Sequence, residues 1–467
     1  MKKILLLVFM MAFLFFAVDA QEITGQWNGV LTVQGVRLRL VFDVVQTSEG
    51  LSSTMDSPDQ GVKGIPTTTT SFENSILKIT LDGPQIAYEG KLGDDQVISG
   101  EFRQGGQTFP LNLSKEVLEE KKPSRPQEPQ KPFPYYSEDL TFENPNAGID
   151  LAGTLTLPQK EGVFPAVILI SGSGPQNRDE ELLGHKPFLV ISDFLTRNGI
   201  AVLRYDDRGT ALSEGDFRSA TSLDFAEDAK AAVEYLRSRK EIIPTKIGLI
   251  GHSEGGVVAS MVASKTVDVA FIVLLAGTGI PGDQLLLLQQ QLVGKASGMS
   301  EENLQKGATI NKELFAMVKS STNLHQLNSD INSFLVETFE NDPNPTLPGG
   351  MGIEEFAKLQ ADQIATPWMQ FFVKYDPAEA LQKVKCPVLA IIGEKDLQVP
   401  PKENLSAIHE ALKKGGNEQV TTKELPDLNH LFQESTTGSP SEYASIEQTI
   451  SPTALTEVLS WIQAQVQ

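Results

Sequence analysis

The sequence predicts an α/β fold with a mostly parallel, doubly wound sheet, an inserted helical cap and a small all-β domain before it. Three observations support this prediction. Short apolar runs alternate with segments of helical periodicity after residue 137, strand-like runs follow one another before residue 117, and a helix-rich stretch interrupts the alternation at residues 283–380. Alternating strands and helices are typical of parallel sheets covered by helices on both faces. A chain of 467 residues is also too long for one ordinary domain.

The first 20 residues have the pattern of a signal peptide. Lys2 and Lys3 precede an apolar run, Ile4–Phe16, and the small residues around Ala20 form a cleavage site. We therefore expect cleavage after Ala20 and export to the periplasm or the outside of a bacterial cell. An uncleaved membrane anchor is the alternative, because the apolar run is only slightly short for a span. No later stretch is long and apolar enough to span a bilayer.

Cysteine content and net charge narrow the class of protein. Cys386 is the only cysteine, so an intrachain disulfide and a cysteine-based zinc site are excluded. An exported protein without disulfides fits a bacterial envelope better than a eukaryotic secretory route. The net charge of −21 argues against nucleic acid and anionic lipid as partners. We expect a small-molecule substrate and neither cofactor nor metal, and the oligomeric state stays open.

Residues 21–116 are predicted to form an all-β accessory domain, a small sandwich or barrel. Strand-like runs separated by Gly and Asp clusters are typical of hairpins. The clearest runs are Val36–Val44, Ile76–Leu81, Ile86–Leu92, Val97–Phe102 and Thr108–Leu113. No grouping of Ser, His and carboxylate lies there, so we expect a role in interaction or stabilisation. Residues 117–136 contain five prolines and many charges, which predicts an extended linker.

Residues 137–467 are predicted to form the catalytic domain. Its buried strands are short and fully apolar, as in parallel sheets, and one intervening segment, Leu223–Ser238, has helical spacing. Residues 283–380 lie between two of these strands, so we interpret them as an inserted helical cap. The predicted core strands are Ala166–Ile170, Ala201–Tyr205, Ile247–Ile250, Phe271–Leu275 and Val388–Ile392.

The stretch LIGHSEGG, residues 249–256, contains the pattern G-x-S-x-G between a predicted strand and a predicted helix. Gly251 and Gly255 have no Cβ, so strand and helix can approach closely and the turn can expose the Ser253 hydroxyl. The backbone N–H of Glu254 then opens the helix where an oxyanion would form. A Gly/Ser-rich turn without chemistry is the alternative, because the pattern also occurs by chance.

Serine catalysis needs a base and a carboxylate that orients it. Of five histidines, only His430 lies in a loop after a late core strand. Asp396 follows the strand Val388–Ile392, and Glu394 and Asp427 are its rivals. We prefer Asp396 because the order Ser, Asp, His is the one expected for an α/β-hydrolase.

A second oxyanion donor is expected in the loop after the strand Ala166–Ile170. The sequence there reads SGSGPQ, and Gly172 and Gly174 let the backbone approach a substrate oxygen. We predict the N–H of Ser173 as the donor, with Gly174 as the alternative.

Several segments resemble a bacterial group of α/β-hydrolase carboxylesterases. These are LISGSGPQNRDE, RYDDRGTALSEGDF, GHSEGG, the stretch from YDPAEAL to DLQVPP, and LPDLNHLFQ, all within residues 137–467. The resemblance implies Ser253 as nucleophile, His430 as base, Asp396 as its orienting acid, and activity on short-chain acyl esters. Ala211 departs from the pattern, because relatives commonly have glycine there, and the all-β domain lies outside the resemblance.

Two other readings of function remain open. An exopeptidase or a thioesterase can use the same fold and residues, because fold does not determine substrate. A binding protein, with the all-β domain as a cell-envelope or glycan anchor, is the alternative from another class.

Overall fold

The computed structural model describes residues 23–467 except 34–35, 49, 61, 82–85, 105–106, 117–123, 344, 346 and 348–350. The predicted signal peptide and the first part of the predicted linker therefore lie outside the described residues. The chain divides into two compact units, residues 1–122 with 337–356, and residues 123–336 with 357–467. None of the helices in the described part is both long enough and apolar enough to cross a membrane.

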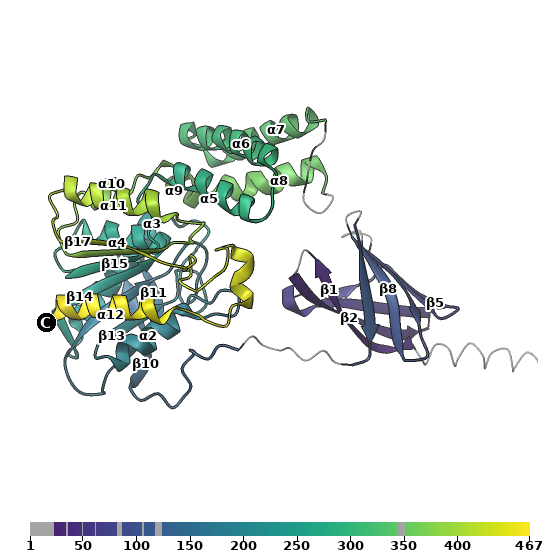
Figure 1. The fold of residues 1–467 in the computed structure, drawn as a ribbon, viewed down its shortest axis with the longest axis horizontal. Helices are drawn as coiled ribbons and strands as arrows, with labels where there is room; N and C mark the ends of the chain where they lie inside the picture. Colours follow the sequence, from purple (N-terminus) through teal and green to yellow (C-terminus); the bar gives the residue numbers. More distant parts are fainter. Residues whose placement is uncertain are drawn as a thin grey trace, which may run out of the picture. The chain divides into compact units, whose positions relative to one another are not determined.

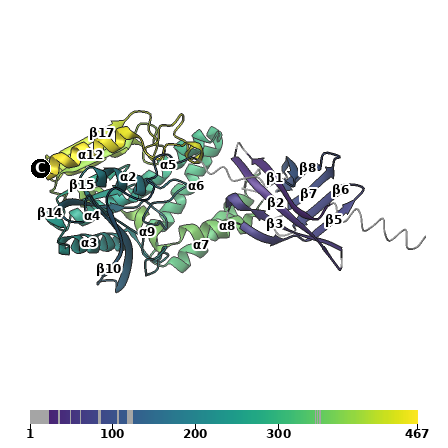
Figure 2. The same cartoon turned by 90° about the horizontal axis from the view of Figure 1, so that it is seen from below.

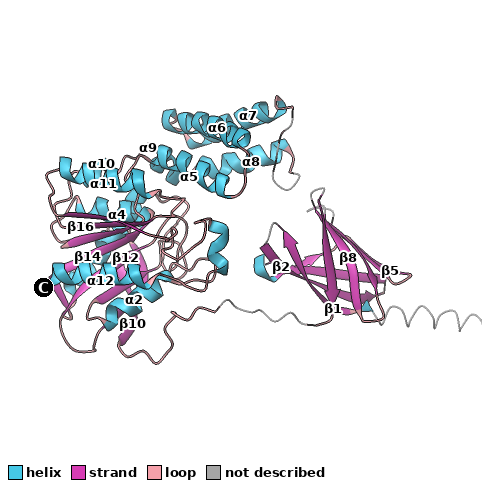
Figure 3. Cartoon of the chain, viewed as in Figure 1, coloured by secondary structure: helices cyan, strands magenta, loops and turns pink. Residues whose placement is uncertain are grey.

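Within the N-terminal unit, the described residues from Gly25 to Ser114 form a nine-stranded antiparallel meander that curls into a barrel (Figures 1 and 3). Strands β4 and β5 end the order β4-β3-β2-β1-β9-β8-β7-β6-β5 but follow each other along the chain. The Ser53 hydroxyl of β3 lies 2.8 Å from the Thr70 hydroxyl of β5, which brings the two ends of the sheet together. The strands are β1 (Gly25–Val33), β2 (Val36–Thr47), β3 (Gly50–Ser57), β4 (Val62–Pro66), β5 (Thr69–Glu73), β6 (Ile76–Leu81), β7 (Ile86–Leu92), β8 (Val97–Gln104) and β9 (Gln107–Ser114).

Large side chains fill the interior of this barrel. Trp27, Phe42 and Tyr88 are buried in one apolar cluster, and the Trp27 indole donates to the Ile23 carbonyl at 2.7 Å. Side chains at alternate strand positions point to this core, which confirms the predicted period-two pattern. A small barrel of this kind holds its shape through side-chain packing.

The second unit contains an eight-stranded sheet within the described residues, in the order β10-β11-β13-β12-β14-β15-β16-β17. Strands β10 and β11 are antiparallel to their neighbours, and the strands from β13 to β17 are parallel. This mostly parallel sheet confirms the predicted α/β-hydrolase fold. The strands are β10 (Tyr136–Asn144), β11 (Ile149–Leu157), β12 (Phe164–Ile170), β13 (Ala201–Tyr205), β14 (Ile242–His252), β15 (Phe271–Leu275), β16 (Val388–Gly393) and β17 (Val420–Leu425).

Helices cover both faces of this sheet (Figures 1 and 2). Alternate residues of β12 belong to two different cores: Ile168 packs with the helices of one face and Val167 with those of the other. Because both faces are buried, the strands are apolar throughout rather than alternating. One face carries α2 (Pro187–Arg197) and α12 (Pro452–Val466), and the other carries α3 (Ser222–Ser238), α4 (Glu254–Ala263), α10 (Ala378–Leu381) and α11 (Pro401–Lys414).

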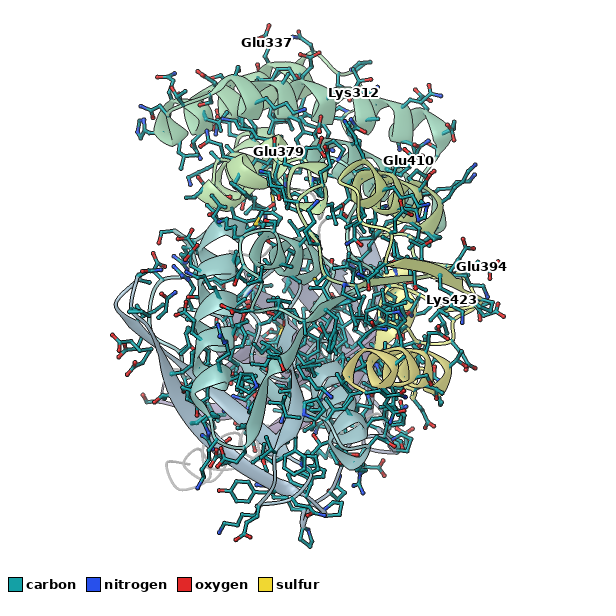
Figure 4. All side chains as sticks on the ribbon, turned by 90° about the vertical axis from the view of Figure 1, so that its left-hand side faces the viewer. Lys312, Glu337, Glu379, Glu394, Glu410 and Lys423 are labelled. Atoms are coloured by element: carbon teal, nitrogen blue, oxygen red, sulfur yellow. The ribbon has the colours of Figure 1, made fainter. Side chains whose placement is uncertain are left out.

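The predicted cap is helical and lies between β15 and β16 in the chain, as expected. Ser300 and Thr366 cap helices α6 and α9 by accepting backbone N–H groups three residues on. Charged side chains such as Lys312 and Glu379 stand on the outer surface (Figure 4). The cap helices are α5 (Gly282–Ala296), α6 (Glu301–Ser320), α7 (Leu324–Glu340), α8 (Ile353–Ile364) and α9 (Pro367–Lys374).

The described end of the predicted linker is docked rather than free. The Arg125 guanidinium donates to backbone carbonyls of Gly184 and Ile446 at 3.1 and 2.5 Å. The Gln127 side chain accepts the Thr449 N–H at 2.6 Å and donates to the Ile450 carbonyl at 2.6 Å. The composition of the linker did not indicate this attachment, because it depends on the hydrogen bonds of two side chains, those of Arg125 and Gln127.

Candidate active site

The turn at Ser253 is strained and requires its flanking glycines. Ser253 has φ 53° and ψ −117°, a conformation that L residues rarely adopt. A Cβ on Gly251 would lie 2.0 Å from the Gly255 carbonyl oxygen, and one on Gly255 would lie 2.1 Å from the Ile170 oxygen. Both positions therefore admit only glycine, and the turn presents Ser253 between the end of β14 and the start of α4.

His430 and Asp396 form a buried pair. The His430 Nδ1 lies 2.8 Å from Asp396 Oδ2, and both side chains are almost fully buried. The other oxygen, Asp396 Oδ1, accepts the N–H groups of Gln398 and Val399, each at 2.8 Å. A carboxylate facing Nδ1 fixes the tautomer with hydrogen on that atom, so the lone pair of Nε2 is left as the acceptor.

Ser253 and His430 approach the same edge of the sheet. His252 precedes Ser253, and its ring lies 4.9 Å from the His430 ring, centroid to centroid. Among the residues that the structure describes, neither Ser253 Oγ nor His430 Nε2 makes a hydrogen bond. Such contacts are often long in a protein without substrate and tighten on binding. The arrangement leaves both groups available to a reacting molecule.

The rival residues occupy other environments. Glu394 is exposed at the surface (Figure 4) and accepts the Asp427 N–H. Asp427 is also exposed and pairs with Lys395 at 2.8 Å. The other histidine in an early loop, His185, is fully buried, and its Nε2 lies 2.9 Å from the Tyr443 carbonyl oxygen. The structure therefore places Asp396, rather than its rivals, beside His430.

Two backbone amides near Ser253 lack acceptors in the described part of the chain, those of Ser173 and Glu254. The Glu254 amide is at the N-terminus of α4, where N–H groups have no partner inside the helix. The neighbouring Gly172 amide is already used, because it donates to Glu180 Oε1 at 2.8 Å. Gly174 adopts φ 97°, which lets the loop turn at this point.

A cavity of about 50 Å³ opens onto Ser253. Its wall mixes polar and apolar side chains and comes from the cap helices α5 and α9 as well as from the sheet edge. Glu254 is the ionisable residue of this wall. The lining residues are Ser173, Ser253, Glu254, Thr278, Leu285, Leu286, Gln289, Trp368, Phe372, Gln398 and Val399.

Comparison with known proteins shows the family of this chain. A model of the X-Pro dipeptidyl-peptidase (S15) family matches residues 147–431, more than half of the chain. The chain belongs to this family. It is 27% identical over 307 residues to Esterase EstD of Thermotoga maritima, an alignment that covers 64% of this chain and 62% of the esterase. The chain thus spans less than two thirds of that relative.

Other matches are more distant. An uncharacterised 31.7 kDa protein of Escherichia coli is 24% identical over 278 residues, covering 57% of this chain and 85% of that protein. The α/β hydrolase GrgF of a Penicillium species has a TM-score of 0.45 at 16% identity, covering 71% of this chain and 99% of GrgF. The Pyrococcus furiosus esterase Pf2001 has a TM-score of 0.42 at 16% identity, covering 73% and 98%.

In this S15-family chain the Glu254 side chain links the Ser253 turn to the cap. Its Oε1 accepts the Ser222 hydroxyl at 2.5 Å and the Trp368 indole N–H at 2.8 Å. Burial raises the pKa of Glu254, although these two donors oppose the shift. Sequence reasoning assigned a role only to the Glu254 amide, since nothing in the local pattern indicated that Trp368 would reach its carboxyl group.

The segment RYDDRG supplies buried carboxyl groups that hold the loop after β12. Asp206 pairs with Arg178 at 2.7 Å. Asp207 accepts the Ser171 hydroxyl at 2.7 Å and the Gln176 N–H at 2.9 Å. Burial raises the pKa of Asp207 to about 8. The sequence signal was a charged run directly after a buried strand, which carried no assigned role before the structure.

Proposed function

We propose that this protein is a serine hydrolase that cleaves carboxylic esters through an acyl-enzyme at Ser253. The observation that carries the proposal is the His430–Asp396 pair, which lies beside the strained Ser253 turn at one sheet edge, next to a small cavity. The similarity to Esterase EstD supports an ester as the substrate.

In this mechanism His430 Nε2 takes the Ser253 proton as Oγ attacks the ester carbonyl carbon. Asp396 stabilises the resulting imidazolium and keeps its orientation. The amides of Glu254 and Ser173 donate to the oxyanion, and one such donor contributes roughly 2.7–4 kcal/mol. His430 then protonates the leaving alcohol, and a water molecule repeats the sequence on the acyl-serine.

The cavity favours short acyl groups. A volume of about 50 Å³ is little more than the space that a few water molecules need. Leu285, Phe372 and Val399 close it with apolar surface. We therefore expect kcat/KM to fall as the acyl chain of the substrate lengthens beyond a few carbons.

Cleavage of X-Pro peptides is the second candidate, because the family model is that of a dipeptidyl-peptidase. A peptidase that removes dipeptides must bind a free amino terminus, and paired carboxylates suit that cation. The cavity wall contains a single carboxyl group, Glu254, whose Oε1 already accepts two hydrogen bonds. This wall favours esters over peptides.

The test compares nitrophenyl esters of increasing acyl length with X-Pro anilides on the same preparation. We expect ester turnover, labelling of Ser253 by a fluorophosphonate, and loss of both in Ser253→Ala. Ser253→Ala that retains most of the ester rate would show that another residue is the nucleophile. Anilide turnover exceeding ester turnover would favour the peptidase.

We also propose that the chain is exported after cleavage at Ala20 and that the barrel has an attachment or stabilising role. The charge and apolar pattern of the first 20 residues and the filled barrel interior support this. N-terminal sequencing of the mature protein and cell fractionation test export. Deletion of residues 21–116 tests the barrel: envelope retention should fall while ester turnover stays.

A further inference from the structure

Two buried residues outside the proposed triad connect the loops that carry the reacting groups. Glu180 and His252 are 4% and 7% exposed. Glu180 Oε1 lies 2.9 Å from His252 Nδ1 and accepts the Gly172 N–H at 2.8 Å. His252 Nε2 lies 3.1 Å from the backbone carbonyl oxygen of His430. A continuous chain of contacts therefore runs from the loop after β12, through His252, to the loop of His430.

The partners of His252 determine where its protons are. A carbonyl oxygen only accepts, so His252 Nε2 must carry hydrogen to bond His430. The group facing Nδ1 is a carboxylate, which also accepts, so Nδ1 carries hydrogen when Glu180 is ionised. The arrangement therefore fits an imidazolium and a carboxylate, each satisfied by the other and by one backbone group.

On the basis of the proposed esterase function, we propose that Glu180 and His252 are positioning residues for the reaction. Together they hold the His430 backbone and the Gly172–Ser173 segment at fixed places on either side of Ser253. Both ring nitrogens of His252 are taken by Glu180 and the His430 carbonyl, so we place it outside the reacting groups. It acts by fixing the positions of His430 and of the Gly172–Ser173 segment relative to each other. A displacement of about 1 Å in such a group can lower the rate on the order of 10²-fold.

The Glu180–His252 pair, which we call the brace, is sensitive to pH because His252 is charged. Burial opposes the charge, but Glu180 and the His430 carbonyl outweigh it and raise the pKa of His252, with a smaller contribution from Asp396. The charged and titratable groups that face His252 are Glu180, His430 and Asp396. Because the folded-state pKa is raised, the imidazolium persists below it and is lost as pH rises through it. We therefore expect turnover to fall on the alkaline side when His252 loses its proton.

The decisive experiment measures kcat and KM for a short-chain nitrophenyl ester across pH in four variants of the full chain. His252→Leu removes both donors and should lower kcat on the order of 10²-fold with little change in KM. His252→Gln can still donate to the His430 carbonyl without a charge, so it should recover most of kcat and lack the alkaline fall. Glu180→Gln should shift that fall to lower pH. His409→Gln removes an imidazole from α11 and serves as the matched control. It should keep the wild-type dependence of kcat and KM on pH.

The outcomes separate this inference from the proposed function. Wild-type protein that neither turns over esters nor reacts with a fluorophosphonate would refute the function itself. Active wild-type protein whose His252→Leu and His252→Gln variants keep the kcat and pH profile of His409→Gln would refute the brace alone. If His252→Leu does not fold, Glu180→Gln decides: an unshifted alkaline fall overturns the proposal.

Discussion

Replacing Asp207 with Asn tests whether a buried carboxylic acid next to the loop after β12 is neutral. Asp207 is 8% exposed, and its two oxygens face the Ser171 hydroxyl and the Gln176 N–H. Its pKa rises from 3.8 to about 8, chiefly through burial. An Asn can make the same two contacts, accepting the Gln176 N–H through its oxygen and donating to the Ser171 hydroxyl through its nitrogen.

The sign and size of the effect follow from linkage. The folded protein binds the Asp207 proton more tightly than the unfolded chain, so stability is lost as pH rises from about 4 to about 8. At about 1.4 kcal/mol for each pH unit, the full shift has an upper limit of roughly 6 kcal/mol. We expect a few kcal/mol, because the site relaxes around the charge. Asp207→Asn should therefore be more stable than the wild type at pH 8–9, and the difference should be several-fold smaller at pH 5.

Chemical denaturation of the full chain at several pH values between 5 and 9 measures this difference. Asp206→Asn is the matched neighbour, because it removes the closer carboxylate partner of the half-buried Arg178 guanidinium and leaves it with Asp139 at 3.4 Å. That variant should lose about 1–3 kcal/mol, by a similar amount at every pH in the range. A difference between Asp207→Asn and wild type that stays constant from pH 5 to pH 9 would refute a neutral Asp207.

Three further predictions concern the triad, the cap and one turn. Asp396→Asn should keep the fold and lower kcat about 10⁴-fold, because His430 loses its orienting carboxylate, and steady-state ester kinetics with a melting curve check both. Trp368→Phe removes the indole donor to Glu254 but keeps the stack on Phe372; it should cost about 1–3 kcal/mol in the free energy of unfolding, against a smaller loss for Trp461→Phe in α12. Ala211 adopts φ 48°, which glycine accepts more readily, so Ala211→Gly should raise the free energy of unfolding by about 1 kcal/mol; an unchanged or lower value would mean that the turn is not strained.

The fold and the proposed triad could be predicted because both follow from short-range pattern and from sheet geometry. Ser253 and Asp396 follow apolar strands, and parallel strands end at a common edge. His430 was chosen because it lies in a loop after a late core strand, and the chain order Ser, Asp, His favoured Asp396 over its rivals. The helical cap was predictable from its composition and from its place between two strands, and the all-β unit from its alternating residues.

The remaining parts of the site depend on contacts between distant segments. Trp368 and Glu254 are separated by 114 residues, and His252 and Glu180 by 72. No local period relates such residues, so only the folded cap and loops show that they meet. The burial of Asp207 could not be predicted from the sequence either, since a run of charges after a strand is usually solvated. The docking of Arg125 was missed for the same reason, because its acceptors are backbone carbonyls that carry no sequence signal.

The loop after β12 shows why this site needs buried acids. As the proposed oxyanion donor, Ser173 must keep its N–H free, so its own amide cannot hold the loop in place. The amides on either side are held instead: Glu180 accepts from Gly172, and Asp207 accepts from Gln176. Apolar packing could bury the loop, but it would not set the direction of a backbone N–H. A hydrogen bond to a carboxyl group fixes both the direction and the distance of that N–H. The protein therefore buries two carboxyl groups, at a cost in stability, so that the Ser173 amide can stay unpaired for the substrate.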